Sequence, residues 1–171
     1  MADLKSKIRE IPDWPKPGVN FKDITPLLED AEGFQEVINK LADPYLGQKI
    51  NKVVGIDARG FIFAAALAYK LGAGLAIVRK KGKLPWKTIG AEYALEYAAN
   101  TIEVHEDAVV PGEKVLIVDD VLATGGTMEA TVGLVKKLGG EITGISFVVE
   151  LGFLEGRKKL GDNKVHSLLV Y

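Results

Sequence analysis

The chain has 171 residues, of which 47% are hydrophobic and 26% are charged, and its net charge is −1. These values are typical of one globular domain, and the near-neutral charge gives no support to a nucleic-acid-binding role. The absence of cysteine excludes disulfides and thiolate chemistry, and no apolar run approaches the length of a membrane span. We therefore expect a single cytoplasmic domain over residues 1–171 that binds neither nucleic acid nor membrane.

The N-terminal part combines a short helical pattern with a proline-rich stretch. Leu4, Ile8 and Ile11 share one side of a predicted helix over residues 3–11. Residues 12–26 hold four prolines, which fix the backbone and remove hydrogen-bond donors, so we expect no regular structure there. A loop of fixed shape can present backbone groups to a ligand or can simply connect two elements, and composition leaves both interpretations open.

Alternating strand and helix patterns follow. They predict, in order, a helix over 33–41, a strand over 52–56, a helix over 61–71 and a strand over 74–78. Such alternation is typical of a mainly parallel sheet, with the functional site at the carboxyl ends of the strands. The polar turns around Asp57, Arg79 and Asp119 should therefore converge at one edge of the sheet.

The alternation of strands and helices breaks down between residues 84 and 108. Residues 92–97 and 101–106 have the period-two pattern of a two-stranded ribbon, with its turn near 98–100. Two strands without an intervening helix indicate an arm that projects from the sheet, and such arms can close over reacting substrates and exclude water. The remaining predicted elements are strands over 142–149 and 165–170 and a short basic helix over 155–160.

The most informative stretch is residues 115–127, Val-Leu-Ile-Val-Asp-Asp-Val-Leu-Ala-Thr-Gly-Gly-Thr. It begins as a strand buried on both faces, runs into the carboxylates Asp119 and Asp120, and continues as a turn of small residues that opens a helix. Backbone N–H groups at a helix N-terminus bind anions when no bulky side chain intervenes. Thr124 and Thr127 can add hydroxyl donors.

The two carboxylates restrict the choice of ligand. A site for phosphate alone should not place two negative charges beside it, because like charges repel. We therefore predict a ligand with phosphate at one end and hydroxyls or a metal beside it, such as a ribose 5-phosphate. Neither Gly-x-x-x-x-Gly-Lys-Ser/Thr nor Gly-x-Gly-x-x-Gly occurs in this segment. A purely structural glycine-rich connection would explain residues 115–118 but not the carboxylates or the Thr-Gly-Gly-Thr run.

This segment resembles the phosphoribosyl-pyrophosphate (PRPP) binding motif of type I phosphoribosyltransferases. From residue 15 nearly to the C-terminus, the chain is similar to the adenine-specific branch of that family. The matching segments are Pro17-Gly-Val-Asn-Phe-Lys-Asp23, Gly55-Ile-Asp-Ala-Arg-Gly-Phe61, Arg79-Lys-Lys-Gly-Lys-Leu-Pro85, Tyr93-Ala-Leu-Glu-Tyr97 and Val149-Glu-Leu151. The resemblance implies the type I phosphoribosyltransferase fold, an α/β architecture with a mainly parallel central sheet flanked by helices. It adds an N-terminal hood (residues 1–32) and a flexible catalytic arm, a β-ribbon (residues 82–108).

The same resemblance implies a reaction. Phosphoribosyltransferases of this branch transfer the phosphoribosyl group of PRPP to N9 of adenine, giving AMP and pyrophosphate in purine salvage with Mg²⁺ as cofactor. It also implies a homodimer. The alternatives are a phosphoribosyltransferase for hypoxanthine or xanthine, a non-catalytic PRPP- or purine-sensing regulator, and a PRPP synthetase-like protein. The sensor would need a DNA-binding segment, and the synthetase an ATP site and a longer chain.

The resemblance assigns the PRPP-binding residues. The expected 5-phosphate ligands are Ala123, Thr124, Gly125, Gly126 and Thr127, and the expected pyrophosphate ligands are Asp57, Ala58, Arg59, Arg79, Lys80 and Lys83. Asp119 and Asp120 are expected to hold the ribose hydroxyls and to help place Mg²⁺ indirectly. Arg59 is the strongest pyrophosphate candidate because a guanidinium gives forked donation. A solvated basic loop is the alternative interpretation for Lys81 and Lys83. The family also implies a cis peptide bond between Asp57 and Ala58.

The remaining assignments concern the base. Glu96, beside Tyr97 in the arm, is the expected general base, since adenine loses its N9 proton as it is alkylated. With Asp119, Asp120 and Arg59 it completes the expected catalytic set. The expected adenine contacts are Val19, Asn20, Phe21, Lys22 and Leu151, with backbone groups of Asn20 and Lys22 pairing with the Watson–Crick edge. A site matched to an exocyclic amine penalises a keto purine. Asn20 departs from the more apolar residue that is associated with this position.

Overall fold

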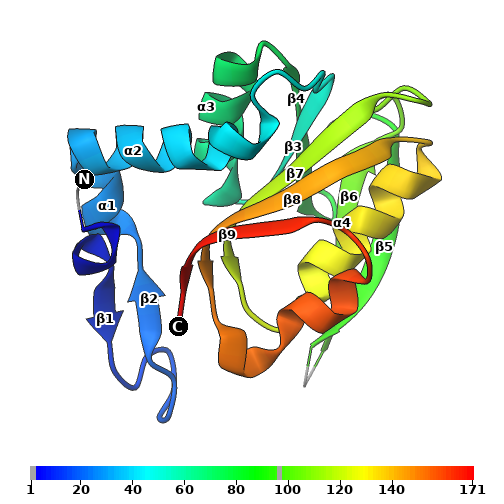
Figure 1. Ribbon diagram of the computed structural model, residues 1–171. Helices are drawn as coiled ribbons and strands as arrows, with labels where there is room; N and C mark the ends of the chain where they lie inside the picture. Colours follow the sequence, from blue (N-terminus) through cyan, green and yellow to red (C-terminus); the bar gives the residue numbers. More distant parts are fainter. Residues whose placement is uncertain (1–2, 96–97) are drawn as a thin grey trace. The chain divides into compact units, whose positions relative to one another are not determined.

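The computed structural model describes residues 3–95 and 98–171 of the chain, and Figure 1 traces them in sequence order. The chain divides into two compact units, Met1–Lys40 and Leu41–Tyr171. Among the described residues, no helix combines the length and the apolar character that a membrane crossing requires.

The first unit is built around a short antiparallel hairpin. Its elements are the 3₁₀ helix η1 (Leu4–Lys7), the strands β1 (Arg9–Ile11) and β2 (Phe21–Asp23), and the helices α1 (Thr25–Glu29) and α2 (Ala31–Ala42), the last of which ends just beyond this unit. In the hairpin, Ile11 lies opposite Phe21 and Glu10 lies opposite Lys22.

Two predictions for this unit were wrong. The helix expected over residues 3–11 is a single 3₁₀ turn, after which residues 9–11 extend as β1, because pairing with β2 supplies the backbone partners that a helix would otherwise provide. Regular structure was not expected over residues 12–26, yet β2 and the start of α1 fall there. The prolines stop at Pro17 and return only at Pro26, which occupies the first turn of α1, where a missing N–H costs nothing.

The second unit contains one seven-stranded sheet in the order β5-β6-β4-β3-β7-β8-β9. The strands are β3 (Lys52–Ile56), β4 (Gly74–Lys80), β5 (Thr88–Leu95), β6 (Ala98–His105), β7 (Lys114–Leu122), β8 (Glu141–Glu150) and β9 (Val165–Val170). The neighbours from β4 to β9 are all parallel, while the β5–β6 ribbon is antiparallel and joins the sheet edge through β4.

Two long helices cover this sheet, α3 (Gly60–Leu71) and α4 (Gly126–Lys137). The crossover from β3 to β4 and that from β7 to β8 run in opposite directions along the sheet, so right-handed connections place α3 and α4 on opposite faces. Figure 1 shows α4 over the β5–β6 side. The short 3₁₀ helices η2 (Asp43–Tyr45), η3 (Gly152–Leu154) and η4 (Gly156–Leu160) complete the unit.

The burial of apolar side chains accounts for the positions of β7, α3 and α4. Residues 115–118 are fully buried, as a strand with helices on both faces requires. On one face α4 contributes Met128, Leu134 and Val135 to a cluster with the central strands, and on the other α3 buries Phe63 and Leu67. The mainly parallel sheet with flanking helices agrees with the predicted architecture.

The ribbon differs from its prediction in two details. Leu95 pairs with Ala98, and residues 98–100, which were expected near the turn, belong to β6. Residues 96–97 lie outside the described residues. The base of the ribbon is also part of the sheet rather than free of it. Ile89, Ala91 and Tyr93 alternate along β5 and pack against the apolar core.

Between β3 and β7 the crossovers reverse direction, and this position organises the sheet edge. In the register of these strands, Gly55 lies beside Val118, which places Asp119 next to the end of β3 and the turn that follows it. Parallel sheets bind ligands outside the carboxyl ends of their strands at such a reversal. We therefore expect a ligand site at this edge of the sheet.

Gly144 on β8 offers a test of core packing. Tyr45 and Ser146 share a buried hydrogen bond of 3.0 Å between their hydroxyls, and a Cβ at Gly144 would lie 2.8 Å from Cε1 of Tyr45 and overlap its hydroxyl. Gly144→Ala should therefore destabilise the protein by about 2 kcal/mol in urea unfolding. Part of that loss should be recovered in a Tyr45→Phe background, where the hydroxyl is gone. An unchanged urea midpoint for Gly144→Ala would contradict this account.

Candidate active site

A cavity of about 410 Å³ opens at the carboxyl ends of β3, β4 and β7. It is lined by Ile56, Asp57, Ala58, Arg59, Val78, Arg79, Lys80, Tyr93, Ile102, Asp119, Asp120 and Thr127. The three polar turns that were expected to converge do so here, because parallel neighbours bring their carboxyl ends to one edge. Three carboxylates and three cationic side chains line the cavity, so it combines both signs of charge.

The two adjacent carboxylates lie inside β7 and not after it, since pairing with β8 continues to Leu122. Asp120 is buried, and its Oδ2 forms an ion pair with Nε of Arg59 at 2.5 Å. That contact lacks the alignment of a hydrogen bond, and among the described residues Oδ2 has no hydrogen-bond partner. Asp119 accepts a hydrogen bond from the backbone N–H of Asp120 through Oδ1, at 2.9 Å.

Burial raises the pKa of Asp119 well above its ordinary value, and the negative charge of Asp120 raises it further. The hydrogen bond from the Asp120 N–H and the nearby charge of Arg59 act in the opposite direction but do not cancel the shift. A carboxyl group in this state needs a compensating partner in order to ionise. Hydroxyl donors or a cation on a bound ligand would supply one.

Gly60 allows the turn after β3 to approach β7 closely. A Cβ at this position would lie 2.6 Å from Oδ1 of Asp119 and 3.2 Å from its Cα. Any larger residue would therefore displace either the Asp119 side chain or the start of α3. The glycine in the Asp57–Gly60 turn is required by this contact between the two loops.

The basic turn after β4 is tied to the turn after β3. Nε of Arg79 lies 3.1 Å from Oδ2 of Asp57, and its Nη1 donates to the backbone carbonyl of Lys83 at 3.2 Å. The peptide bond between Asp57 and Ala58 is cis, as the resemblance implied. Lys80 lines the cavity, whereas Lys83 is exposed and is not among the lining residues.

A second cavity, of about 80 Å³, adjoins the first at the start of α4. Its lining includes all five residues of the expected phosphate loop, Ala123, Thr124, Gly125, Gly126 and Thr127. Asp119 and Thr127 line both cavities. Gly125 has a positive φ of 80°, which lets the chain turn from the strand into the helix with its first N–H groups free of intrahelical acceptors.

The other predicted site residues fall in three places. Glu96 and Tyr97 lie outside the described residues. Val19–Lys22 belong to the first unit, and Leu151 follows β8 in the second, where its N–H donates to the carbonyl of Leu122 at 2.9 Å. Tyr93 lines the larger cavity and was not assigned a role from the sequence, although its place in the period-two pattern of β5 could have indicated an inward-facing side chain.

The hairpin of the first unit has a polar brace. Glu10 accepts hydrogen bonds from Nζ of Lys22 at 2.5 Å and from Nδ2 of Asn20 at 3.0 Å. The Asn20 side chain therefore has a partner within its own unit, which explains why a polar residue is accommodated there. The rings of Trp14 and Phe21 meet edge to face, with centroids 4.5 Å apart.

Comparisons with known proteins identify the family of the chain. The phosphoribosyl transferase domain matches residues 23–166. An adenine phosphoribosyltransferase of Geobacter metallireducens is 60% identical over 171 residues, which is 100% of both chains.

The chain belongs to the adenine phosphoribosyltransferase family.

Solved structures support the same assignment. The enzyme from Rhodothermus marinus is 52% identical with a TM-score of 0.94, covering 98% of this chain and 96% of that one. The enzyme from Saccharomyces cerevisiae, solved with adenine and an iminoaltritol bisphosphate, is 38% identical with a TM-score of 0.92, covering 97% and 96%. The expected family, type I phosphoribosyltransferase fold and class of enzyme are thereby confirmed. As a member of the adenine phosphoribosyltransferases, the chain is a pentosyltransferase of purine salvage.

The raised pKa of Asp119 predicts that this site lowers stability at neutral pH. The folded chain holds the Asp119 proton more tightly than the unfolded chain, whose carboxyl has the ordinary value of 3.8, so the contribution to stability is lost as pH rises through the raised pKa. In metal-chelating buffer without ligand, Asp119→Asn should therefore raise the melting temperature at pH 7.5. The gain should shrink towards pH 5.

An exposed carboxylate serves as the control for this measurement. Asp107 lies on a surface turn, so Asp107→Asn should leave the melting temperature nearly unchanged at both pH values. A lower melting temperature for Asp119→Asn at pH 7.5 would show that the carboxylate is stabilised by partners that outweigh its burial.

Proposed function

We propose that this protein transfers the 5-phosphoribosyl group of PRPP to N9 of adenine, releasing pyrophosphate and forming AMP. The observation that carries the proposal is the junction of the two cavities. Asp119 and Thr127 line both, so the carboxylate pair adjoins an anion site on one side and a cationic wall on the other. A ribose with phosphate at C5 and pyrophosphate at C1 is complementary to this arrangement. Its 5-phosphate would face the anion site, its hydroxyls the carboxylates, and its pyrophosphate the cations.

The chemistry follows from the charges that develop during the reaction. Cleavage of the C1–oxygen bond leaves positive charge on the ribose ring and negative charge on pyrophosphate. Asp119 and Asp120 would hold the ribose hydroxyls and stabilise the ring charge, while Arg59, Arg79 and Lys80 would stabilise the leaving group. The 5-phosphate would be held by the backbone N–H groups at the start of α4, where the helix dipole also favours an anion.

The proposed cofactor is Mg²⁺, and the donor set fits it in a limited way. Among the described residues, no group of three or more His, Cys, Asp and Glu side chains could hold an ion by itself. Magnesium usually keeps several waters and binds through one or two carboxylates together with substrate phosphates, which the Asp119–Asp120 pair can provide. Bound in that way, it would neutralise charge on pyrophosphate as the leaving group departs.

Base recognition is assigned to the hood. Backbone groups of Asn20 and Lys22 would pair with the Watson–Crick edge of adenine, and Phe21 and Leu151 would pack against the ring. The hydrogen bonds from Asn20 and Lys22 to Glu10 support this proposal, because they restrain the two residues whose backbone would read the base. Glu96 in the arm is the proposed general base for the N9 proton. We also infer a cytoplasmic homodimer.

The function is tested by AMP formation from PRPP, Mg²⁺ and adenine, with hypoxanthine, guanine and xanthine in parallel. Turnover should be confined to adenine, since a keto purine would leave donors and acceptors mismatched. Replacing both carboxylates, Asp119→Ala with Asp120→Ala, should lower kcat/KM by about 10³-fold or more. Asp107→Ala is the matched control and should retain full activity. Turnover of a keto purine would overturn the proposed specificity, and the absence of transfer to any base would favour a PRPP-sensing role.

The hood proposal predicts a selective effect of Glu10. Glu10→Ala removes the brace from Asn20 and Lys22, so the KM for adenine should rise about two- to fivefold, on the scale of an exposed ion pair. The KM for PRPP should stay unchanged. Glu32→Ala, which removes an exposed carboxylate of α2, should alter neither constant. Equal changes in both constants for Glu10→Ala would argue against a role confined to the base.

A further inference from the structure

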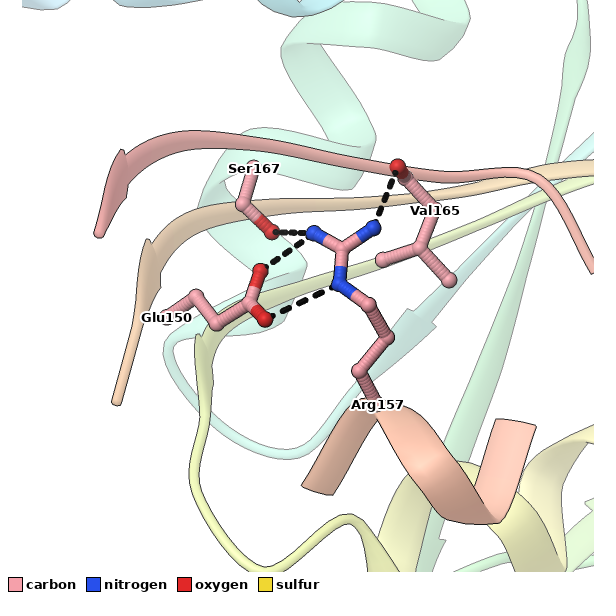
Figure 2. Close-up of polar contacts among 4 residues, drawn as sticks. All are labelled: Glu150, Arg157, Val165 and Ser167. Carbon is pink, nitrogen blue, oxygen red and sulfur yellow. Dashed lines mark hydrogen bonds and ion pairs between the residues drawn. The ribbon is translucent and has the colours of Figure 1, made fainter. Parts of the chain in front are cut away.

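The segment after β8 carries a charged cluster that the proposed reaction does not use. Figure 2 shows the guanidinium of Arg157, on η4, facing the carboxylate of Glu150 at the end of β8. Nε donates to Oε1 at 2.9 Å and Nη2 to Oε2 at 2.5 Å, which is the bidentate arrangement. Nη1 donates to the Val165 carbonyl at 3.0 Å, and Nη2 also reaches the Ser167 hydroxyl at 3.4 Å. Arg157 therefore fastens η4 to the end of β8 and to the first half of β9.

The two charged side chains differ in their exposure to solvent. The Glu150 side chain is 9% exposed, whereas that of Arg157 is 47% exposed. The hydrogen bonds from Arg157 hold the pKa of Glu150 below its ordinary value although burial acts in the opposite direction. The hydrogen-bonded carboxylate in turn raises the pKa of Arg157. The pair is therefore charged at neutral pH, and a guanidinium this well matched to a carboxylate allows little freedom of orientation.

The residue before Arg157 touches the phosphate loop directly. A Cβ on Gly156 would overlap the carbonyl oxygen of Ala123 and lie 2.9 Å from the backbone nitrogen of Gly125. Conversely, a Cβ on Gly125 would overlap the carbonyl oxygen of Gly156 and lie 3.1 Å from its Cα. The two backbones are in contact without a side chain between them. Any shift of η4 must therefore be passed on to the loop.

We propose that the Glu150–Arg157 pair is a positioning device for the 5-phosphate site, because it fixes η4 so that Gly156 supports the phosphate loop from behind. Neither side chain lines either cavity, so the effect passes through backbone contact and not through the ligand. The strand ends reinforce the arrangement, since Leu151 donates to the carbonyl of Leu122, the residue just before the loop. The inference rests on the proposed placement of the 5-phosphate at residues 123–127.

This role predicts a selective loss of affinity for ligands that carry a 5-phosphate. In titration calorimetry with the full chain, Arg157→Gln should raise the Kd for ribose 5-phosphate and for AMP about tenfold, as expected when a binding group is slightly misplaced. The Kd for pyrophosphate should stay within about twofold, because its proposed ligands lie in the turns after β3 and β4 and not in the loop that Gly156 touches. In steady-state kinetics the KM for PRPP should rise while the KM for adenine does not.

Two further variants keep the test decisive if Arg157→Gln folds poorly. The double variant Glu150→Gln with Arg157→Gln removes the uncompensated buried charge while still allowing amide hydrogen bonds, and it should show the same selective loss. Gly156→Ala leaves the ion pair intact but forces η4 and the loop apart, so it should also weaken ribose 5-phosphate binding. Its matched control is Gly133→Ala on α4, where a Cβ would meet nothing within 4 Å. That control should bind ribose 5-phosphate normally.

A purely structural role is distinguished by a variant with a similar loss of stability elsewhere. Tyr45→Phe removes the buried hydrogen bond to Ser146 and should lower the melting temperature without changing ribose 5-phosphate affinity. If Arg157→Gln behaves in the same way, or if it weakens pyrophosphate binding equally, the positioning role is overturned. If the unaltered protein forms AMP but Gly156→Ala keeps full ribose 5-phosphate affinity, the inference fails alone. If the unaltered protein binds no ribose 5-phosphate, the proposed function fails and the inference fails with it.

Discussion

Two adjacent carboxylates, Asp119 and Asp120, lie within the central strand β7, and the rest of the sheet edge is arranged around their charges. Asp119 and Asp120 extend β7 beyond the end of β3, where β8 still pairs with the strand on its other side. Two negative charges in such a position need compensation. Arg59 compensates Asp120 through an ion pair, whereas burial and the neighbouring charge of Asp120 raise the pKa of Asp119. The buried carboxylates therefore lower the stability of the folded chain, and the hydroxyl groups of a phosphate-bearing sugar would compensate them.

Two glycines allow neighbouring loops at the sheet edge to approach each other closely. Gly60 brings the turn after β3 against Asp119, and Gly156 brings η4 against the phosphate loop at Gly125. Side chains at these positions would separate loops that have to act on one small ligand. A rigid parallel sheet sets where the loops begin, and the glycines decide how near they come. The Glu150–Arg157 pair adds a fixed point behind one of these contacts.

The two units divide the proposed work according to the kind of group that each presents. The second unit presents charged side chains and a helix N-terminus, which suit a highly charged sugar phosphate. The first unit presents a hairpin in which Glu10 holds the side chains of Asn20 and Lys22, and the backbone of such a hairpin suits the hydrogen-bonding edge of a neutral base. If the hairpin backbone reads the base as proposed, the exposed side chain of Asn20 does not have to contact that base.

Signals that lie within a few residues were enough to predict the strand–turn–helix alternation, the small-residue turn at 123–127 that opens a helix, and the convergence of the polar turns. Such signals failed where long-range pairing overrode local preference, as at residues 9–11, which became a strand because β2 lay within reach. Three ion pairs emerge only from the folded chain: Arg59 with Asp120, Arg79 with Asp57 and Arg157 with Glu150. The first two contacts join residues far apart in the chain, and their partners are set by strand order and register, which no local pattern encodes. Arg157 and Glu150 lie close in sequence, but their pairing depends on how η4 folds back against the end of β8.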